Sequence, residues 1–163
     1  HHPEVLLLDE PTFGVDPISR RELWLILHEM VAEGVTVVVS TSYLDEAERC
    51  DRVVLLHEGR PLALDRPQAL QASLEGAMLA LRADRPRDAR DVLRGSGTVL
   101  AASLFGEAVH ARLGPGQDPR AAVDALERAG IVVESAEVVE PSLEDLFIHL
   151  VAAAEAAAAS SSV

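Results

Sequence analysis

A short aliphatic run that ends on two adjacent carboxylates constrains the fold of this chain more than any other feature. The run is Val5–Leu8, followed directly by Asp9 and Glu10. Because apolar and polar residues do not alternate in it, the run predicts a strand buried on both faces of a parallel sheet. A buried helix would also fit, but the prolines at positions 3 and 11 limit the run to strand length.

The two carboxylates stand where open α/β sheets place their ligands, at the carboxyl end of a strand. Asp9 can hold Mg²⁺ through water, because Mg²⁺ keeps much of its hydration shell and takes few protein carboxylates. Glu10 can orient and polarise a water molecule for attack on a phosphoryl group. The structural alternative is an acidic strand end that is only solvated, and an isolated pair of acids favours it. The residues that follow therefore decide between the two readings.

The next segments predict a strand–helix–strand unit of a parallel sheet. A turn-rich loop leads into a helix over residues 18–32, with Asp16 as its N-cap and Pro17 in its first turn. A second buried strand is expected at 35–39, with hydroxyl-bearing residues at its end. The apolar stripe of the helix, spaced by three and four, is Leu23, Ile26, Leu27, Met30 and Val31.

Shorter elements follow, and the motifs on them resemble a known family. A short acidic helix is expected at 44–49, a hairpin of strands 52–56 and 61–64, and a helix at 66–74. Residues 6–12 resemble the Walker B strand of ABC-transporter ATP-binding subunits, and residues 14–17 resemble their D-loop. Residues 40–52 resemble the switch region with its following helix, and 53–59 the next strand and turn. The similarity, to the exporter type above all, covers about half of the chain.

The resemblance implies a role for each carboxylate of the first half and for one serine. Asp9 would support the Mg²⁺ of MgATP, and Glu10 would be the general base or water-orienting carboxylate. Asp16 would be the D-loop aspartate that communicates across a dimer of two ATPase subunits. Ser42 stands where the family usually has a histidine that contacts the γ-phosphate, and a serine carries no charge and reaches less far.

Three explanations fit the serine at the switch position. The site hydrolyses slowly, it is one of an asymmetric pair, or a nearby group such as Thr41 compensates. A strand-end capping hydroxyl is the structural alternative for Ser42, with about equal weight.

The resemblance also implies cofactors, partners and a location for the intact protein. ATP and Mg²⁺ would be the cofactors, and the partners would be a second ATP-binding subunit, identical or different, and an integral membrane permease. The subunit would be cytoplasmic, held at the inner face of the cell membrane by the permease. A formal net charge of −13 argues against a nucleic-acid partner, which needs a basic face.

No phosphate loop of the form G-x-x-x-x-G-K-[ST] occurs in the 163 residues. That loop supplies the backbone N–H groups and the lysine that hold the β- and γ-phosphates. We therefore expect a fragment or truncated product, the C-terminal part of an ATP-hydrolysing exporter subunit, that does not bind ATP measurably or hydrolyse it by itself. The alternative is a non-catalytic fragment that acts only as a dimerisation or regulatory module.

A change of composition near residue 76 predicts a second, smaller domain. The expected bounds are 1–75 for the partial P-loop NTPase sheet with its helices, 76–151 for an accessory α+β domain and 152–163 for an Ala/Ser-rich tail. The accessory domain reads as a ferredoxin-like βαββαβ unit. Its expected strands are 78–83, 98–103, 108–113 and 131–139, and its expected helices are 86–93 and 119–129.

The second half shows no convergent catalytic set. His110 is expected to be an exposed strand residue, and Trp24 and Phe147 are expected to be packing residues. A last helix is expected to begin at Pro141 and Ser142 with a box-like cap, to continue by propensity to position 159 and to fray from Ser160. An acidic cluster is expected to be a solvated face: Glu137, Glu140, Glu144 and Asp145.

Overall fold

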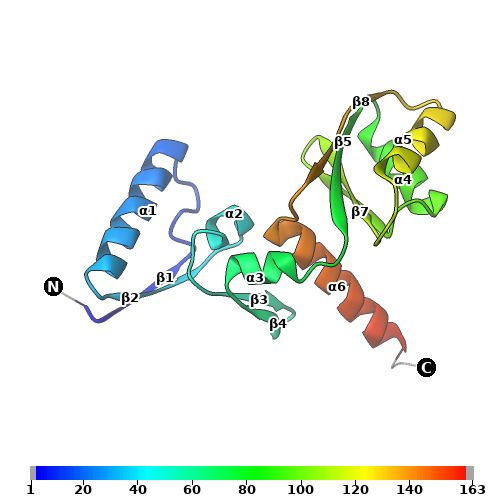
Figure 1. The fold of residues 1–163 in the computed structure, drawn as a ribbon. Helices are drawn as coiled ribbons and strands as arrows, with labels where there is room; N and C mark the ends of the chain where they lie inside the picture. The colour runs from blue at the N-terminus through cyan, green and yellow to red at the C-terminus, as the bar shows by residue number, and fades with distance from the viewer. Residues whose placement is uncertain (1–2, 161–163) are drawn as a thin grey trace. The chain divides into compact units, whose positions relative to one another are not determined.

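The computed structural model describes residues 3–160 as a mixed α/β chain with small sheets (Figure 1). The chain divides into two compact units, one that ends at Arg49 and one that begins at Cys50. The composition-based boundary near residue 76, and the domain bounds drawn from it, stay a prediction.

The first unit contains the strand–helix–strand order that the sequence predicts. Strands β1 (Val5–Asp9) and β2 (Thr36–Ser40) pair in parallel, with Asp9 opposite Ser40. Helix α1 (Pro17–Ala32) connects them, and the short helix α2 (Leu44–Ala47) follows. The parallel pairing brings the acidic and the hydroxyl-bearing strand ends to the same sheet edge.

The expectation that both strands are buried on both faces is wrong in this structure. Val5, Leu7 and Val38 are 55%, 72% and 53% exposed, whereas Leu6 and Leu8 are partly buried. Successive side chains of a strand point to opposite faces, and one helix beside two strands covers only one face. One face of the two-stranded sheet is therefore covered and the other is exposed.

The buried stripe of α1 also differs from the expected one. Trp24 and Leu27 are the buried residues of this helix, so Trp24 is a packing residue as expected. Ile26 and Val31 are exposed, at 52% and 41%. The helix packs through a narrower stripe than its apolar spacing indicates, because only two strands lie beneath it. Asp16 is the N-cap, as the sequence predicts.

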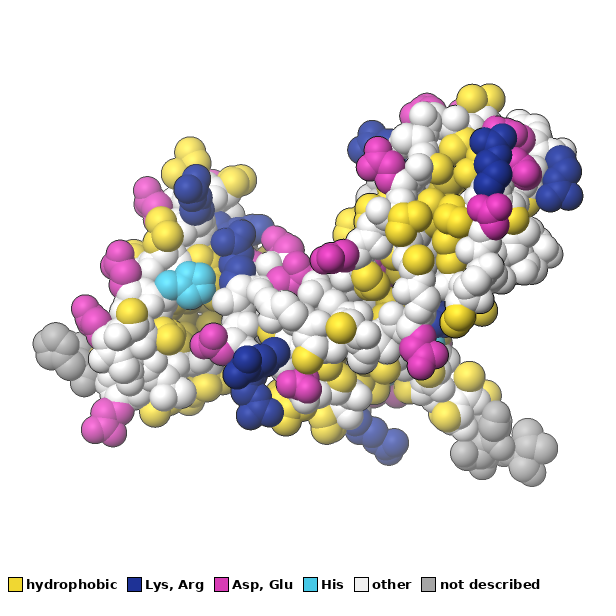
Figure 2. Space-filling model, viewed as in Figure 1, with side chains coloured by type: hydrophobic (Ala, Val, Ile, Leu, Met, Phe, Trp, Pro, Cys, Tyr) yellow, Lys and Arg dark blue, Asp and Glu magenta, His cyan; other side chains and the backbone are white. Residues whose placement is uncertain are grey.

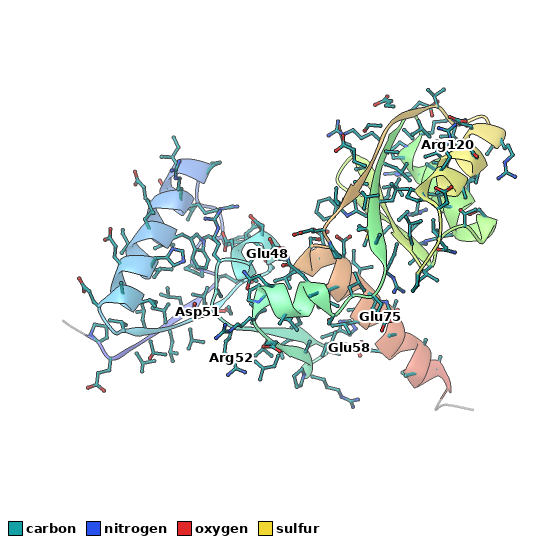
Figure 3. The ribbon with its side chains drawn as sticks, in the orientation of Figure 1. Glu48, Asp51, Arg52, Glu58, Glu75 and Arg120 are labelled. Atoms are coloured by element: carbon teal, nitrogen blue, oxygen red, sulfur yellow. The ribbon has the colours of Figure 1, made fainter. Side chains whose placement is uncertain are left out.

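The second unit begins with a hairpin and a short helix. Strands β3 (Val53–His57) and β4 (Arg60–Asp65) are antiparallel and precede helix α3 (Pro67–Ala72). The two turn residues, Glu58 and Gly59, both have positive φ angles, 49° and 73°, which a two-residue turn of type I′ requires. Figure 3 shows Glu58 at this turn.

A four-stranded antiparallel sheet with two helices follows in the second unit. Its elements are β5 (Ala77–Ala83), α4 (Pro86–Ser96), β6 (Ala101–Phe105), β7 (Ala108–Leu113), α5 (Pro119–Arg128) and β8 (Val133–Val139). Its strand order is β6-β7-β5-β8, and helices α4 and α5 contribute to its core. Strand β6 spans residues 101–105 instead of the expected 98–103, because α4 ends before Gly97, which has a left-handed backbone, and residues 97–100 form the connection.

The core of this sheet comes from alternate strand residues and one stripe of each helix. Leu79 and Leu81 of β5 are at most 1% exposed and pack with Leu93 of α4 and Leu126 of α5. This packing fixes the sheet and its two helices as one layered body.

Helix α6 (Leu143–Ser160) closes the described chain. Ser142 and Asp145 cap it reciprocally: the Ser142 N–H donates to Asp145 Oδ2 at 2.9 Å, and the Asp145 N–H donates to Ser142 Oγ at 3.1 Å. The box-like start is therefore confirmed. The helix includes Ser160, the last described residue, and the expectation that the chain frays from there stays a prediction. Residues 161–163 lie outside the described part. Between residues 3 and 160, no helix has both the length and the apolarity to cross a membrane.

Candidate functional site at the paired strand ends

Asp9 and Ser40 lie side by side at the carboxyl ends of β1 and β2. The Ser40 hydroxyl donates a hydrogen bond to Asp9 Oδ1. Asp9 is otherwise exposed to solvent. The strand end thus presents one carboxylate that a neighbouring hydroxyl orients and that water can reach.

Glu10 follows with a strained backbone. Its φ angle is 43°, in the left-handed region that residues other than glycine seldom occupy. Its N–H donates to Ser40 O at 2.9 Å and lies 3.3 Å from Ser40 Oγ, so β2 holds the strained residue in place. Such strain, of order 1–3 kcal/mol, persists where surrounding contacts enforce it and is common at functional sites.

Ser42 reaches Glu10 across the strand ends. Its hydroxyl donates to Glu10 Oε2 at 3.4 Å, which is a long hydrogen bond. The capping role in this turn belongs to Thr41, whose Oγ1 accepts from the Tyr43 N–H at 3.1 Å. The structure therefore brings together Asp9, Glu10 and Ser42, the three predicted site residues nearest the strand ends.

Asp16 is the N-cap of α1 and accepts hydrogen bonds from the first turn of that helix. Its Oδ1 accepts from the N–H groups of Ile18 and Ser19 at 3.0 and 3.1 Å. Hydrogen bonds from the side chain and backbone of Ser19, and then from Ile18, lower the pKa of Asp16, because they favour the charged carboxylate.

A buried carboxylate that the sequence pattern does not single out lies beneath the strand ends. Glu46 of α2 is 0% exposed, and its Oε2 accepts hydrogen bonds from Thr12 Oγ1 at 2.9 Å and Thr41 Oγ1 at 3.1 Å. Arg20 of α1 lies 3.5 Å from Glu46 Oε1 and 4.7 Å from the centre of the Tyr43 ring. Three of residues 45–48 are acidic, and the sequence gives no sign of which acid faces inward.

The donor set at the strand ends fits Mg²⁺ only through water. Within residues 3–160 no group of three or more His, Cys, Asp or Glu side chains is placed to hold a metal ion. Asp9 is a single exposed carboxylate beside Glu10, and Mg²⁺ commonly binds one or two carboxylates and otherwise keeps water and phosphate oxygens. Asp9 is thus the residue that would hold the ion.

Two expectations for the second unit are corrected. His110 is not an exposed strand residue: its side chain is 11% exposed, stacks on Phe105 at 4.2 Å, and its Nδ1 lies 2.8 Å from Asp145 Oδ1. Asp145 is 5% exposed and does not belong to a solvated acidic face. The reason is that the first turn of α6 brings Asp145 against His110 of β7, so the two side chains contact each other instead of water. Phe147 contacts His57 edge to face at 6.4 Å, a packing role as expected.

The surface hollows of the second unit lie away from these residues. One, of about 480 Å³, is lined by Asp124, Glu127 and Arg128 of α5. Beside it Arg120 lies 2.8 Å from Asp124 Oδ1, an exposed ion pair that contributes little to stability (Figure 3). Figure 2 shows acidic and basic side chains interspersed on the face in view.

The comparisons with known proteins agree with the motifs. Residues 66–151, more than half of the chain, match the family described as "ATP-binding protein DrrA1-3-like, C-terminal domain". The chain is 36% identical over 157 residues to the daunorubicin resistance ATP-binding protein DrrA2 of Streptomyces coeruleorubidus, with 91% of this chain and 48% of that protein covered.

Two further relatives cover different shares of the chain. The Nod factor export ATP-binding protein I of Rhizobium leguminosarum bv. viciae is 32% identical over 150 residues, with 91% of this chain and 46% of that protein covered. The probable multidrug ABC transporter ATP-binding protein YbhF of Escherichia coli K12 is 57% identical over 74 residues, 45% of this chain and 13% of that protein. The chain spans about half the length of the DrrA2 and Nod factor relatives. It belongs to the family of ABC transporter ATP-binding proteins that carry a DrrA1-3-like C-terminal domain.

Proposed function

We propose that this chain is the C-terminal portion of a subunit that hydrolyses ATP to power a membrane exporter. The observation that supports this most is the parallel pairing of β1 and β2, which puts Asp9, Glu10 and Ser42 at one sheet edge. The names of the relatives, which include a probable multidrug ABC transporter ATP-binding protein and a Nod factor export ATP-binding protein, support the exporter assignment.

In the proposed mechanism, Glu10 orients a water molecule for in-line attack on the γ-phosphate. Its carboxylate already accepts a hydrogen bond from Ser42, which limits its rotamers and leaves its other oxygen for water. Asp9, held by the Ser40 hydroxyl, would hold the water shell of Mg²⁺. The ion would neutralise charge on the phosphates when bound, since phosphoryl transfer depends on positioning and electrostatics.

In our proposal, Ser42 stands at the position where the family usually has a histidine that contacts the γ-phosphate. Its hydroxyl offers one uncharged donor and is directed to Glu10. We therefore propose that turnover is slow. We also propose that Asp16 contacts the second subunit. The subunit would lie at the cytoplasmic face of the membrane, joined to its permease.

We further propose that residues 76–151, within the second unit, form a ferredoxin-like accessory domain. The order βαββαβ from β5 to β8 and the sheet order β6-β7-β5-β8 support this arrangement.

The test is steady-state ATPase activity of the full-length subunit with its permease. We expect Glu10→Gln to lower turnover by about 10²-fold or more, because the amide cannot take a proton. Ser42→His is expected to raise turnover. If Glu10→Gln turns over like the native protein, the role of Glu10 is wrong.

A further inference from the structure

A buried cluster in the first unit holds together the two segments that carry Glu10 and Ser42. We define the Glu46 cluster as Glu46, Thr12, Thr41 and Arg20. Thr12 lies two residues after Glu10, and Thr41 lies one residue before Ser42. Glu46 and Thr12 are both 0% exposed.

One carboxylate oxygen joins the two segments. Glu46 Oε2 accepts from Thr12 Oγ1 at 2.9 Å and from Thr41 Oγ1 at 3.1 Å, so the loop after β1 and the turn after β2 share one acceptor. Arg20, which lies 3.5 Å from the other oxygen, offsets the cost of the buried charge. We expect the removal of one hydroxyl to shift one segment relative to the other.

This arrangement sets the distance between Ser42 and Glu10, on which the proposed hydrolysis depends. Ser42 Oγ lies 3.4 Å from Glu10 Oε2, at the outer limit of a hydrogen bond. The strained backbone of Glu10, with φ at 43°, needs contacts on both sides to persist. On one side, the N–H of Glu10 donates to the carbonyl oxygen of Ser40 in β2. On the other side, Thr12, two residues after Glu10, donates to Glu46 Oε2.

We propose that the Glu46 cluster positions Glu10 against Ser42, with Glu46, Thr12 and Thr41 as positioning residues that act through Glu10. This inference rests on the proposed function. A positioning role predicts a loss in kcat with little change in KM, because the cluster does not touch nucleotide, and misplacement by about 1 Å can cost up to 10²-fold.

The experiment measures ATPase kinetics and thermal unfolding of the full-length subunit with its permease. Thr12→Val removes the donor and keeps the shape, and we expect kcat to fall about tenfold with KM within about twofold of native. Thr12→Ser restores the donor and should recover most of the native kcat. The matched control is Asp45→Asn, an exposed acid next to Glu46 on the same helix, which should turn over like native.

A double substitution separates a positioning role from a general structural one. If Thr12 acts through Glu10, then Thr12→Val lowers the residual kcat of Glu10→Gln by much less than tenfold, because the effects are not additive. An undiminished tenfold loss in that background would show a structural role and overturn the proposal. A native kcat in folded Thr12→Val would also overturn it.

The remaining outcomes are equally decisive. If Thr12→Val does not fold, Thr41→Val, which removes the other donor to Glu46 Oε2, replaces it under the same criteria, and failure of both to fold shows that the cluster only supports the fold. If native turnover is absent, or if Glu10→Gln leaves it unchanged, the proposed function fails. If Glu10→Gln abolishes turnover while Thr12→Val does not affect it, only the positioning role fails.

Discussion

Asp16 shows how a single carboxylate can begin a helix. Its Oδ1 accepts from the N–H groups of Ile18 and Ser19, which have no partner inside α1. Asp16→Ala removes the acceptor and should speed hydrogen exchange of the amides in the first turn. Asp16→Asn keeps an acceptor and should protect those amides nearly as well as native. Equal exchange in Asp16→Ala and native protein would contradict the capping role.

The partners of a residue decide whether the sequence can reveal its role. The cap at Asp16 was predictable because its donors lie two and three residues away. Glu46 pairs with Thr12, 34 residues away, and His110 pairs with Asp145, 35 residues away. Nothing in the local spacing distinguishes Glu46 from its exposed neighbour Asp45, so the tertiary structure was needed to find the cluster.

At the scale of elements, the first turn of α6 depends on one buried carboxylate, Asp145, which contacts His110 and Ser142. Burial raises the pKa of Asp145, but hydrogen bonds from His110 and Ser142 and the charge of His110 outweigh it and lower the pKa below 3.8. Asp145→Asn should lower the free energy of unfolding of the second unit by about 1–3 kcal/mol. Glu144→Gln, on the same turn, should change it by less than about 0.5 kcal/mol.

The same carboxylate gives a pH dependence with a definite sign. Because the folded pKa of Asp145 lies below its unfolded value, near 3.8, the contribution is complete above that value. It is lost as the pH falls through the folded pKa, in the strongly acid range. Urea unfolding from pH 5 to pH 2 should show a smaller loss of stability in Asp145→Asn than in native protein, and equal losses would contradict the pairing.

Two glycines of the second unit should respond to alanine in opposite directions. Gly76, before β5, has φ of 97°, and a Cβ there would lie 2.0 Å from Leu113 O, so Gly76→Ala must displace backbone. Gly95 lies in α4, and a Cβ there would meet nothing within 4 Å beyond its chain neighbours and the backbone of its own helix, so Gly95→Ala should stabilise by about 0.5–1 kcal/mol. Thermal unfolding should give a lower Tm for the first and a higher Tm for the second.

The sequence predicted the order of the elements better than their burial. Periodicity located α1 and β5, and turn residues located the hairpin at Glu58 and Gly59, because these signals are local. Burial depends on what covers a face, and the run Val5–Leu8 does not contain that information. Leu7 is 72% exposed although its sequence is that of a buried strand.

At the scale of the whole molecule, the charge balance opposes nucleotide binding by this chain alone. It carries 27 acidic and 14 Lys and Arg residues, and it lacks the G-x-x-x-x-G-K-[ST] motif. Two carboxylates at the strand ends repel a polyphosphate unless Mg²⁺ and a phosphate cradle offset the charge. Calorimetric titration of the 163-residue chain with MgATP should show no binding, and micromolar affinity would contradict this.

In the proposed mechanism, Glu10 acts on the attacking water and not on nucleotide binding. The most direct measurement is single-turnover hydrolysis of bound MgATP by the full-length subunit with its permease, in native and Glu10→Gln forms. We predict nucleotide affinity within about threefold of native and hydrolysis slower by about 10²-fold or more. Equal single-turnover rates in the two proteins would contradict the claim.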